Sequence, residues 1–197
     1  MPRAEKAVTA ADIVDLETFG KERAERRAAI LPTKKLRRIE VGPHATFYFE
    51  NFDTMLLQIQ EMLYIEKGGE AQLADELSAY NPLIPQGSEL VATVMFEIDD
   101  PVRRLSILRR LGGIEERMFI EVDGERIMGV PTDDVERTTE DGKTSSVHFV
   151  RFAFTDPQKS KMRDPGVQIL AGMDHENYAH LAVLSPASRA ELAKDFD

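Results

Sequence analysis

Stretches in which apolar and polar residues alternate recur along the chain and predict β-strands. Residues 89–98 form a strong strand pattern, and residues 146–154 form the longest one, rich in β-branched and aromatic side chains. Asp123-Gly124 separates two further apolar stretches and is a hairpin signal. The other predicted strands cover residues 37–42, 44–50, 117–122, 126–130, 166–172 and 178–184.

Helical patterns lie between these strands, and capping residues indicate where they begin. A first helix begins after Asp12 and runs to about Ile30, and Pro32 is expected to break or restart it. A second helix covers residues 54–66. Further helices are expected over residues 70–80, from Pro101 to Leu111, and from Ser185-Pro186 onward.

The order of these elements predicts the fold class. Strands and helices are partly segregated, which favours an α+β fold with a largely antiparallel sheet over a doubly wound parallel one. We expect a single domain over residues 1–197, with a helical, basic N-terminal segment at about 10–38. No glycine-rich loop follows a strand, so neither a Rossmann nor a P-loop nucleotide site is supported.

The helix predicted over residues 54–66, TMLLQIQEMLYIE, has no broad polar face. When its residues are placed at intervals of about 100°, no arc wider than about 80° is free of apolar side chains. Such a helix is usually covered on several sides, so we expect a buried central helix packed against the sheet. Gln58 and Glu61 then lie in an apolar setting, where a carboxylate must be paired with a cation or be protonated.

Two interpretations of Gln58 and Glu61 stay open. Either both are structural cross-links from the helix to strand backbones or to an arginine, or they line a ligand or metal pocket. Candidate partners lie in the strand predicted over residues 146–154. There His148 shares the face of the apolar Phe152, and Arg151 lies on the opposite face.

Composition excludes several classes of protein. The chain is 42% hydrophobic and 30% charged, values that are ordinary for a soluble globular protein. It has no apolar run long enough to span a bilayer and no signal-peptide core at its N-terminus, so we expect no membrane association and a cytoplasmic location. The absence of cysteine excludes disulfides, thiolate nucleophiles and cysteine-ligated metal sites.

Charge is unevenly distributed along the chain. The net charge is −10, yet the segment 21–38 carries +6, so the remainder carries −16. A basic segment on an acidic protein can bind nucleic acid, a phosphate-bearing ligand or an acidic partner. The overall negative field disfavours nucleic acid, and the favoured interpretation is a solvated helix whose charges pair locally or against the acidic body.

Metal chemistry finds little support in the sequence. His175 and His180, with Asp174 and Glu176 beside them, are a weak metal-site candidate, and a plain polar connection is the favoured interpretation. No Glu-x-x-His pair of the kind that binds di-iron centres is present. We therefore expect no tightly bound iron or zinc and no other cofactor.

Several segments, in one order along the chain, resemble a known bacterial family. The segments are VGPHATFYFE, QIQEM, ELSAYNPLIP, VATVMFEI, GGIE and KTSSVHFVRF, and the likeness extends over nearly the whole chain from about Asp12. The family is DUF3501, a domain of unknown function. The matching residues are Gly42, Pro43, Gln58, Gln60, Glu61, Tyr80, Asn81, Pro82, His148, Arg151 and Phe152, and the chain departs from the expected pattern at Tyr64.

The resemblance implies a context rather than a reaction. Genes of this family tend to lie beside those of rubrerythrin-like di-iron proteins and iron–sulfur oxidoreductases, which implies a role in redox or oxidative-stress metabolism and a redox-protein partner. The resemblance also adds two residues to the candidate polar cluster. That cluster is Gln58, Glu61, His148, Arg151, Tyr80 and Asn81.

Two functional classes follow from these observations. The first is a non-catalytic accessory protein that works with a redox enzyme and docks through its acidic body or its basic segment. The second is a small-molecule or metal-dependent enzyme with a pocket around Glu61, Gln58, His148 and Arg151. Convergence of these four side chains in one solvent-connected pocket would favour the second class.

Overall fold

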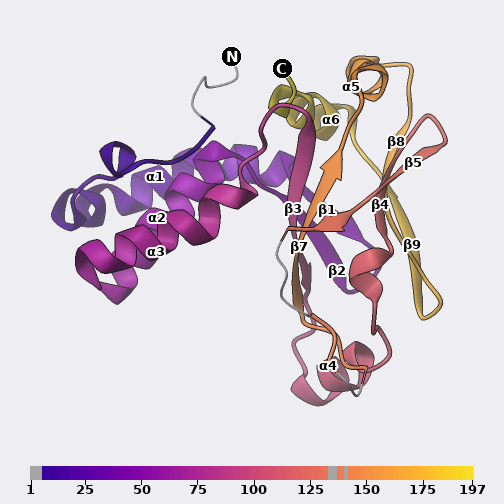
Figure 1. Cartoon of the computed structure of the whole chain (residues 1–197), viewed down its shortest axis with the longest axis horizontal. Coiled ribbons are helices and arrows are strands. Elements are labelled where there is room, and N and C mark those ends of the chain that lie inside the picture. The colour runs from indigo at the N-terminus through magenta and orange to yellow at the C-terminus, as the bar shows by residue number, and fades with distance from the viewer. Residues whose placement is uncertain (1–5, 133–136, 140–141) are drawn as a thin grey trace.

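The computed structural model describes residues 6–132, 137–139 and 142–197, and it contains two antiparallel sheets and a set of helices (Figure 1). The five-stranded sheet has the order β1-β2-β3-β7-β6, and the four-stranded sheet has the order β5-β4-β8-β9. The α+β class and the antiparallel pairing predicted from the sequence are confirmed. The strands are β1 (Arg38–Val41), β2 (Ala45–Phe49), β3 (Glu89–Phe96), β4 (Met118–Val122), β5 (Glu125–Met128), β6 (Val130–Pro131), β7 (Val147–Ala153), β8 (Ile169–His175) and β9 (Tyr178–Val183).

The main hydrophobic core lies between the two sheets. Alternate residues of β3 and β7 point into it, among them Val94 and Phe152, and they meet Ile120 of β4 and Ala171 of β8 from the other sheet. The two faces predicted for β7 are therefore confirmed, since His148 lies on the buried face.

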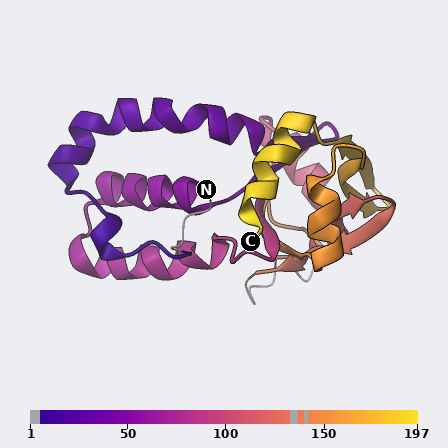
Figure 2. The ribbon, with the colours of Figure 1, turned by 90° about the horizontal axis from the view of Figure 1, so that it is seen from above.

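Six α-helices accompany the sheets in the described part of the chain. Three of them form a helical lobe beside the five-stranded sheet, seen on the left of Figure 1 and from above in Figure 2. The lobe helices are α1 (Leu16–Leu36), α2 (Phe52–Glu66) and α3 (Gly69–Tyr80), and the other helices are α4 (Pro101–Leu108), α5 (Asp156–Arg163) and α6 (Pro186–Leu192). The lobe has its own hydrophobic cluster, in which Met55, Ile59 and Leu63 of α2 pack against Val91 of β3.

The structure corrects three expectations about the helices. The helix α1 passes through Pro32 without a break and is capped by Asp15 rather than Asp12. The missing N–H of Pro32 leaves the carbonyl one turn earlier without its helical partner. Pro32 is exposed, so this carbonyl faces water. The helix α4 ends at Leu108 rather than Leu111. The helix α5 was not predicted.

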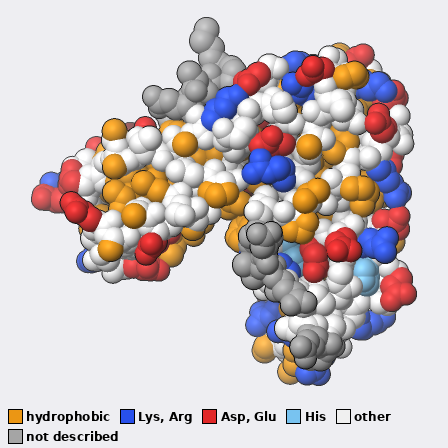
Figure 3. Space-filling view, in the orientation of Figure 1, with side chains coloured by type: hydrophobic (Ala, Val, Ile, Leu, Met, Phe, Trp, Pro, Cys, Tyr) orange, Lys and Arg blue, Asp and Glu red, His pale blue; other side chains and the backbone are white. Residues whose placement is uncertain are grey.

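The helix α2 carries more buried residues than the other described helices, six in all, but it is not covered on every side. Leu57 and Met62 are half-buried, and Ile65 is exposed. Figure 3 shows apolar side chains gathered on the surface of the lobe. The predicted central helix is therefore a lobe helix with one face on the sheet.

The turn between β1 and β2 is held by a tyrosine from the other sheet. The hydroxyl of Tyr178 donates a hydrogen bond to the Val41 carbonyl at 2.7 Å and accepts from the backbone N–H groups of His44 and Ala45 at 3.0 and 2.9 Å. Gly42 has a positive φ of 72°, and a Cβ there would lie 2.8 Å from this hydroxyl. The turn is thus built around the Tyr178 hydroxyl.

Tyr178→Phe should destabilise the protein by about 2–3 kcal/mol, because it leaves buried backbone groups without their partner. Urea unfolding measures this loss. Tyr64→Phe is the control, since the Tyr64 hydroxyl makes no hydrogen bond within the described ranges. Equal stability of the two variants would contradict the role given to Tyr178.

In the described residues, no helix is long and apolar enough to cross a bilayer. The extent of a single domain over the whole chain stays a prediction.

Candidate functional site

A buried carboxyl group lies where the outer face of the five-stranded sheet meets α2. Glu50 follows β2 and precedes Asn51, the residue that caps α2. The pleat of the sheet sends Tyr48 of β2 and Thr93 of β3, which are opposite each other in the register, to this outer face. Glu50 is only 9% exposed there.

Two neutral hydroxyl groups bind the Glu50 carboxylate. Thr54 Oγ1 donates to Oε2 at 2.7 Å, and Thr93 Oγ1 donates to Oε1 at 2.8 Å. The carboxylate forms no ion pair with any residue that the structure describes. A buried carboxylate that is bound only by hydroxyls retains much of the cost of its desolvation.

Burial raises the pKa of Glu50 above its ordinary value of 4.5. The two threonine hydroxyls act in the opposite direction, as do the positive charges of Lys34 and Arg37, but they do not cancel the effect of burial. Glu50 therefore holds a proton more readily than an exposed glutamate does. A buried carboxyl group with a raised pKa on a pocket wall is a candidate for proton exchange with a ligand.

Glu50 lines a pocket of about 290 Å³. This is the size of a site for a small metabolite. The wall combines apolar surfaces with a few polar groups that come from α1, α2, β2 and β3. The lining residues are Lys34, Arg37, Tyr48, Phe49, Glu50, Thr54, Gln58 and Met95.

The two cations of this pocket differ in what they already bind. Arg37 is 1% exposed, and its guanidinium donates to the carbonyls of Phe49 and Glu50, both at 2.9 Å, and pairs with Asp195. Lys34 is exposed at the end of α1, and its ammonium forms no ion pair or hydrogen bond in the part of the chain that the structure describes. Lys34 is therefore the cation that remains for a ligand.

The phenol of Tyr48 completes one wall. Its hydroxyl donates to Glu97 Oε1, and burial together with this carboxylate raises the pKa of Tyr48 to about 12. Tyr48 is thus a neutral hydrogen-bonding group at physiological pH, and Glu50 is the carboxyl group of this pocket whose pKa is raised by burial.

Glu61, for which Arg151 was a candidate partner, pairs with Arg23 of α1. Arg23 Nη2 and Nε approach Glu61 Oε2 at 2.7 and 3.0 Å, and the guanidinium also lies 5.2 Å from the centre of the Tyr64 ring. The pair links α1 to α2 and is partly exposed. This ion pair is compatible with the structural interpretation of Glu61, which stays a prediction.

Glu61→Gln should lower the melting temperature by only about 1–3 °C, because solvent screens a partly exposed ion pair. Arg23→Gln should give the same loss, and the double variant should lose no more than either single one. Thermal melts of the wild type, the two single variants and the double variant complete a double-mutant cycle. Fully additive losses would show that the ion pair contributes nothing to stability.

The other predicted polar residues of the lobe bind their neighbours. Gln58 Nε2 lies 3.4 Å from the Tyr80 hydroxyl, a weak contact, and its side chain reaches the Glu50 pocket. Asn81 exchanges two hydrogen bonds with the backbone of Val8, and Gln60 does the same with the backbone of Val14. Asn81 and Gln60 therefore fasten the N-terminal segment to the lobe.

His148 and Arg151 lie apart from the lobe carboxylates and from each other. His148 faces the core between the sheets, where Nε2 is 2.9 Å from the Ser145 carbonyl and 3.3 Å from Thr144 Oγ1. Arg151, on the outer face, pairs with Glu89 and donates to the Pro82 carbonyl at 2.9 Å. The structure thus does not bring the six predicted residues together, and Gln58 is the one that lines the Glu50 pocket.

The weak metal candidate does not assemble. His175 Nε2 lies 3.1 Å from the Gly112 carbonyl, and Asp174 pairs with Arg126 at 2.7 Å. Within the described ranges, no three histidine, aspartate or glutamate side chains gather as metal ligands. The expectation that the protein holds no tightly bound metal or cofactor stays a prediction.

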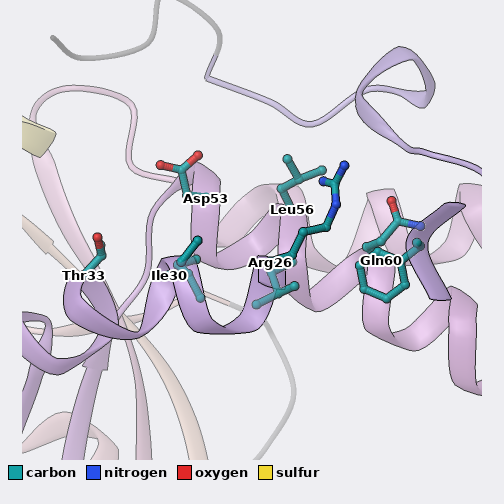
Figure 4. A pocket seen from close by; sticks show the side chains of 9 residues that line it. Arg26, Ile30, Thr33, Asp53, Leu56 and Gln60 are labelled. Atoms are coloured by element: carbon teal, nitrogen blue, oxygen red, sulfur yellow. The ribbon is translucent and has the colours of Figure 1, made fainter. Parts of the chain in front are cut away.

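A second pocket, of about 340 Å³, lies between α1 and α2 (Figure 4). Phe19, Ile30 and Leu56 give it apolar walls. Two of its polar groups are already engaged, since Arg26 pairs with Glu22 at 2.8 Å and Gln60 binds the backbone of Val14. The Glu50 pocket combines a buried acid with Lys34, which has no ion pair among the described residues, and is therefore the better candidate site.

Glu50 was not among the residues singled out from the sequence. At the end of an alternating strand pattern, a glutamate on the polar face is normally in solvent. The signal that was present is its position directly before Asn51, the cap of α2, because a residue there lies where a strand end and a helix start meet.

The fold and this pocket define an α+β protein with two antiparallel sheets, a helical lobe and one buried acid in a site of metabolite size. The chain belongs to the DUF3501 family, proteins of unknown function, whose model matches residues 7–196. It is similar to a crystal structure from Burkholderia pseudomallei K96243, described as a novel protein of unknown function at 1.90 Å resolution. The two share 38% sequence identity and a TM-score of 0.89 over 97% of this chain and 100% of that one. No curated protein matches.

Proposed function

We propose that this protein binds a small molecule in the Glu50 pocket and that Glu50 exchanges a proton with it. The observation that carries the proposal is a buried carboxyl group on the wall of a 290 Å³ pocket, hydrogen-bonded among the described residues only to Thr54 and Thr93. A site that stabilised only the fold would place a cation or an apolar residue there.

This proposal differs from the alternative pocket around Glu61, Gln58, His148 and Arg151, of which Gln58 alone lines the Glu50 pocket. The role beside a redox protein, implied by the family resemblance, stays a prediction, as does the cytoplasmic location. A small-molecule site is compatible with either an enzyme or an accessory protein. A protein that carries a proton-exchanging ligand could serve a redox partner without itself being reduced.

The proposal is tested by closing the pocket. Met95 lines the pocket from β3, so Met95→Trp should fill it. Met128 is 45% exposed on β5, so Met128→Trp is the matched control. A metabolite library screened by thermal shift, with native mass spectrometry of gently purified protein, should give ligands that bind wild type and Met128→Trp but not Met95→Trp. Ligands that bind all three proteins equally would refute the site.

A further inference from the structure

The charges that face Glu50 are positive. From α1 and the residue after it come Lys34 and Arg37, and both lower the pKa of Glu50. The groups from the other elements are neutral: Tyr48 of β2, Thr54 and Gln58 of α2, and Thr93 and Met95 of β3. Glu50 is the one carboxyl group among the described residues that line this pocket.

The two positive charges leave an unbalanced cation. The charge of Arg37 is matched by Asp195. Glu191, whose Oε1 is 3.6 Å from Arg37 Nη1, also pairs with Lys194 and is matched by it. Lys34 has no such partner in the described part of the chain. When Glu50 is protonated, the pocket therefore carries a net positive charge. A cationic ligand would be repelled by Lys34, whereas an anionic one would pair with it.

Resting on the proposed function, we infer that the ligand of the Glu50 pocket is a small oxyanion, a carboxylate or a phosphate, whose charge pairs with Lys34 while Glu50 holds a proton. The Gln58 amide supplies a further donor, since its contact with Tyr80 is long at 3.4 Å. The apolar surfaces of Phe49 and Met95 would contact the rest of the ligand.

This assignment couples binding to proton uptake. An oxyanion beside an ionised Glu50 would face a like charge in a site of low dielectric, so binding favours the protonated form. The affinity should therefore be greatest at low pH. Above the pKa of free Glu50 it should fall about tenfold for each pH unit, as expected for uptake of one proton.

Calorimetric titration with pyruvate, which stays ionised across the range, tests the pH dependence between pH 5.5 and 8.5. Inorganic phosphate at a single pH tests the other oxyanion, and methylammonium tests the opposite charge. In buffers of different ionisation enthalpy, pyruvate should show uptake of one proton. Glu50→Gln, a neutral isostere, should bind pyruvate with an affinity that no longer changes with pH.

The role of Lys34 is tested by comparing substitutions of Lys34 and of its neighbour Lys35. Lys34→Gln should weaken pyruvate binding at least tenfold. Lys35→Gln, the next residue on α1 and no part of the pocket wall, should leave it unchanged. Equal binding by both variants, or no oxyanion binding at millimolar concentration, would overturn the inference. Binding of methylammonium but of neither oxyanion would also overturn the inference. If Met95→Trp abolishes that methylammonium binding, the proposed small-molecule site is still supported. Ligands insensitive to Met95→Trp would instead remove the site.

Discussion

Glu50→Gln is expected to raise the melting temperature at neutral and alkaline pH. The amide removes the charge that burial disfavours and keeps the shape of the side chain. Its oxygen can accept from Thr93 Oγ1, and its NH₂ group can donate to Thr54 Oγ1, which can then donate to the Asn51 carbonyl at 3.1 Å. Each unit by which the pKa of Glu50 is raised corresponds to about 1.4 kcal/mol. Each kcal/mol gained would raise the melting temperature by about 2–4 °C.

The pH dependence has a definite sign. Because the pKa of Glu50 is raised in the folded state, the folded protein binds more protons than the unfolded chain between the ordinary value of 4.5 and the raised one. Wild-type stability should therefore fall as the pH rises through this window, and Glu50→Gln should remove that fall. At pH 4 the two proteins should melt alike.

Thermal melts from pH 4 to pH 9 make the comparison. Glu25→Gln, at an exposed position of α1, is the control and should not alter the pH profile. A Glu50→Gln protein that is less stable than wild type at every pH would show that the carboxylate contributes to the fold. A residue that destabilises the fold and is nevertheless present is better explained by activity.

The strands were predictable because local signals set them. Asp123-Gly124 forms the β4–β5 turn, with positive φ at both residues, as its composition indicates. The alternation in β7 also gave the correct faces for His148 and Arg151. What alternation does not give is the neighbour of each face. His148 faces the core between the sheets, and Arg151 faces the lobe.

The partners of charged residues were less predictable, because they depend on which elements meet. The basic segment does pair locally, as Lys21 does with Glu17, and this matches the favoured interpretation of its charge. Arg23, however, reaches Glu61, and no periodicity distinguishes it from Arg151 as a partner. Glu50 shows the same limit, since its burial results from α2 folding onto β3, which its own strand does not indicate.

The largest loss of stability is expected from Arg37→Gln. The Arg37 guanidinium is nearly inaccessible, and it joins three separate parts of the chain: the end of α1, the carbonyls of Phe49 and Glu50, and the carboxylates of Glu191 and Asp195 near the C-terminus. Glutamine can replace few of these contacts. The buried carboxylate of Asp195 would lose its ion pair, whereas Glu191 would keep the one with Lys194. Breaking a buried pair typically costs about 3–5 kcal/mol. The melting temperature should fall by roughly 10 °C or more.

The pH profile separates this loss from a mere packing defect. Burial already raises the pKa of Asp195, and Arg37 opposes that effect. Without Arg37 the pKa should rise further, so the variant should lose stability as the pH rises above the ordinary value of 3.8 and recover part of it on acidification. Arg38→Gln is the matched control, because its ion pairs with Glu40 and Glu97 are exposed, both at 3.4 Å. A deficit in Arg37→Gln that stays constant from pH 4 to pH 8 would rule out the uncompensated Asp195 carboxylate as its cause.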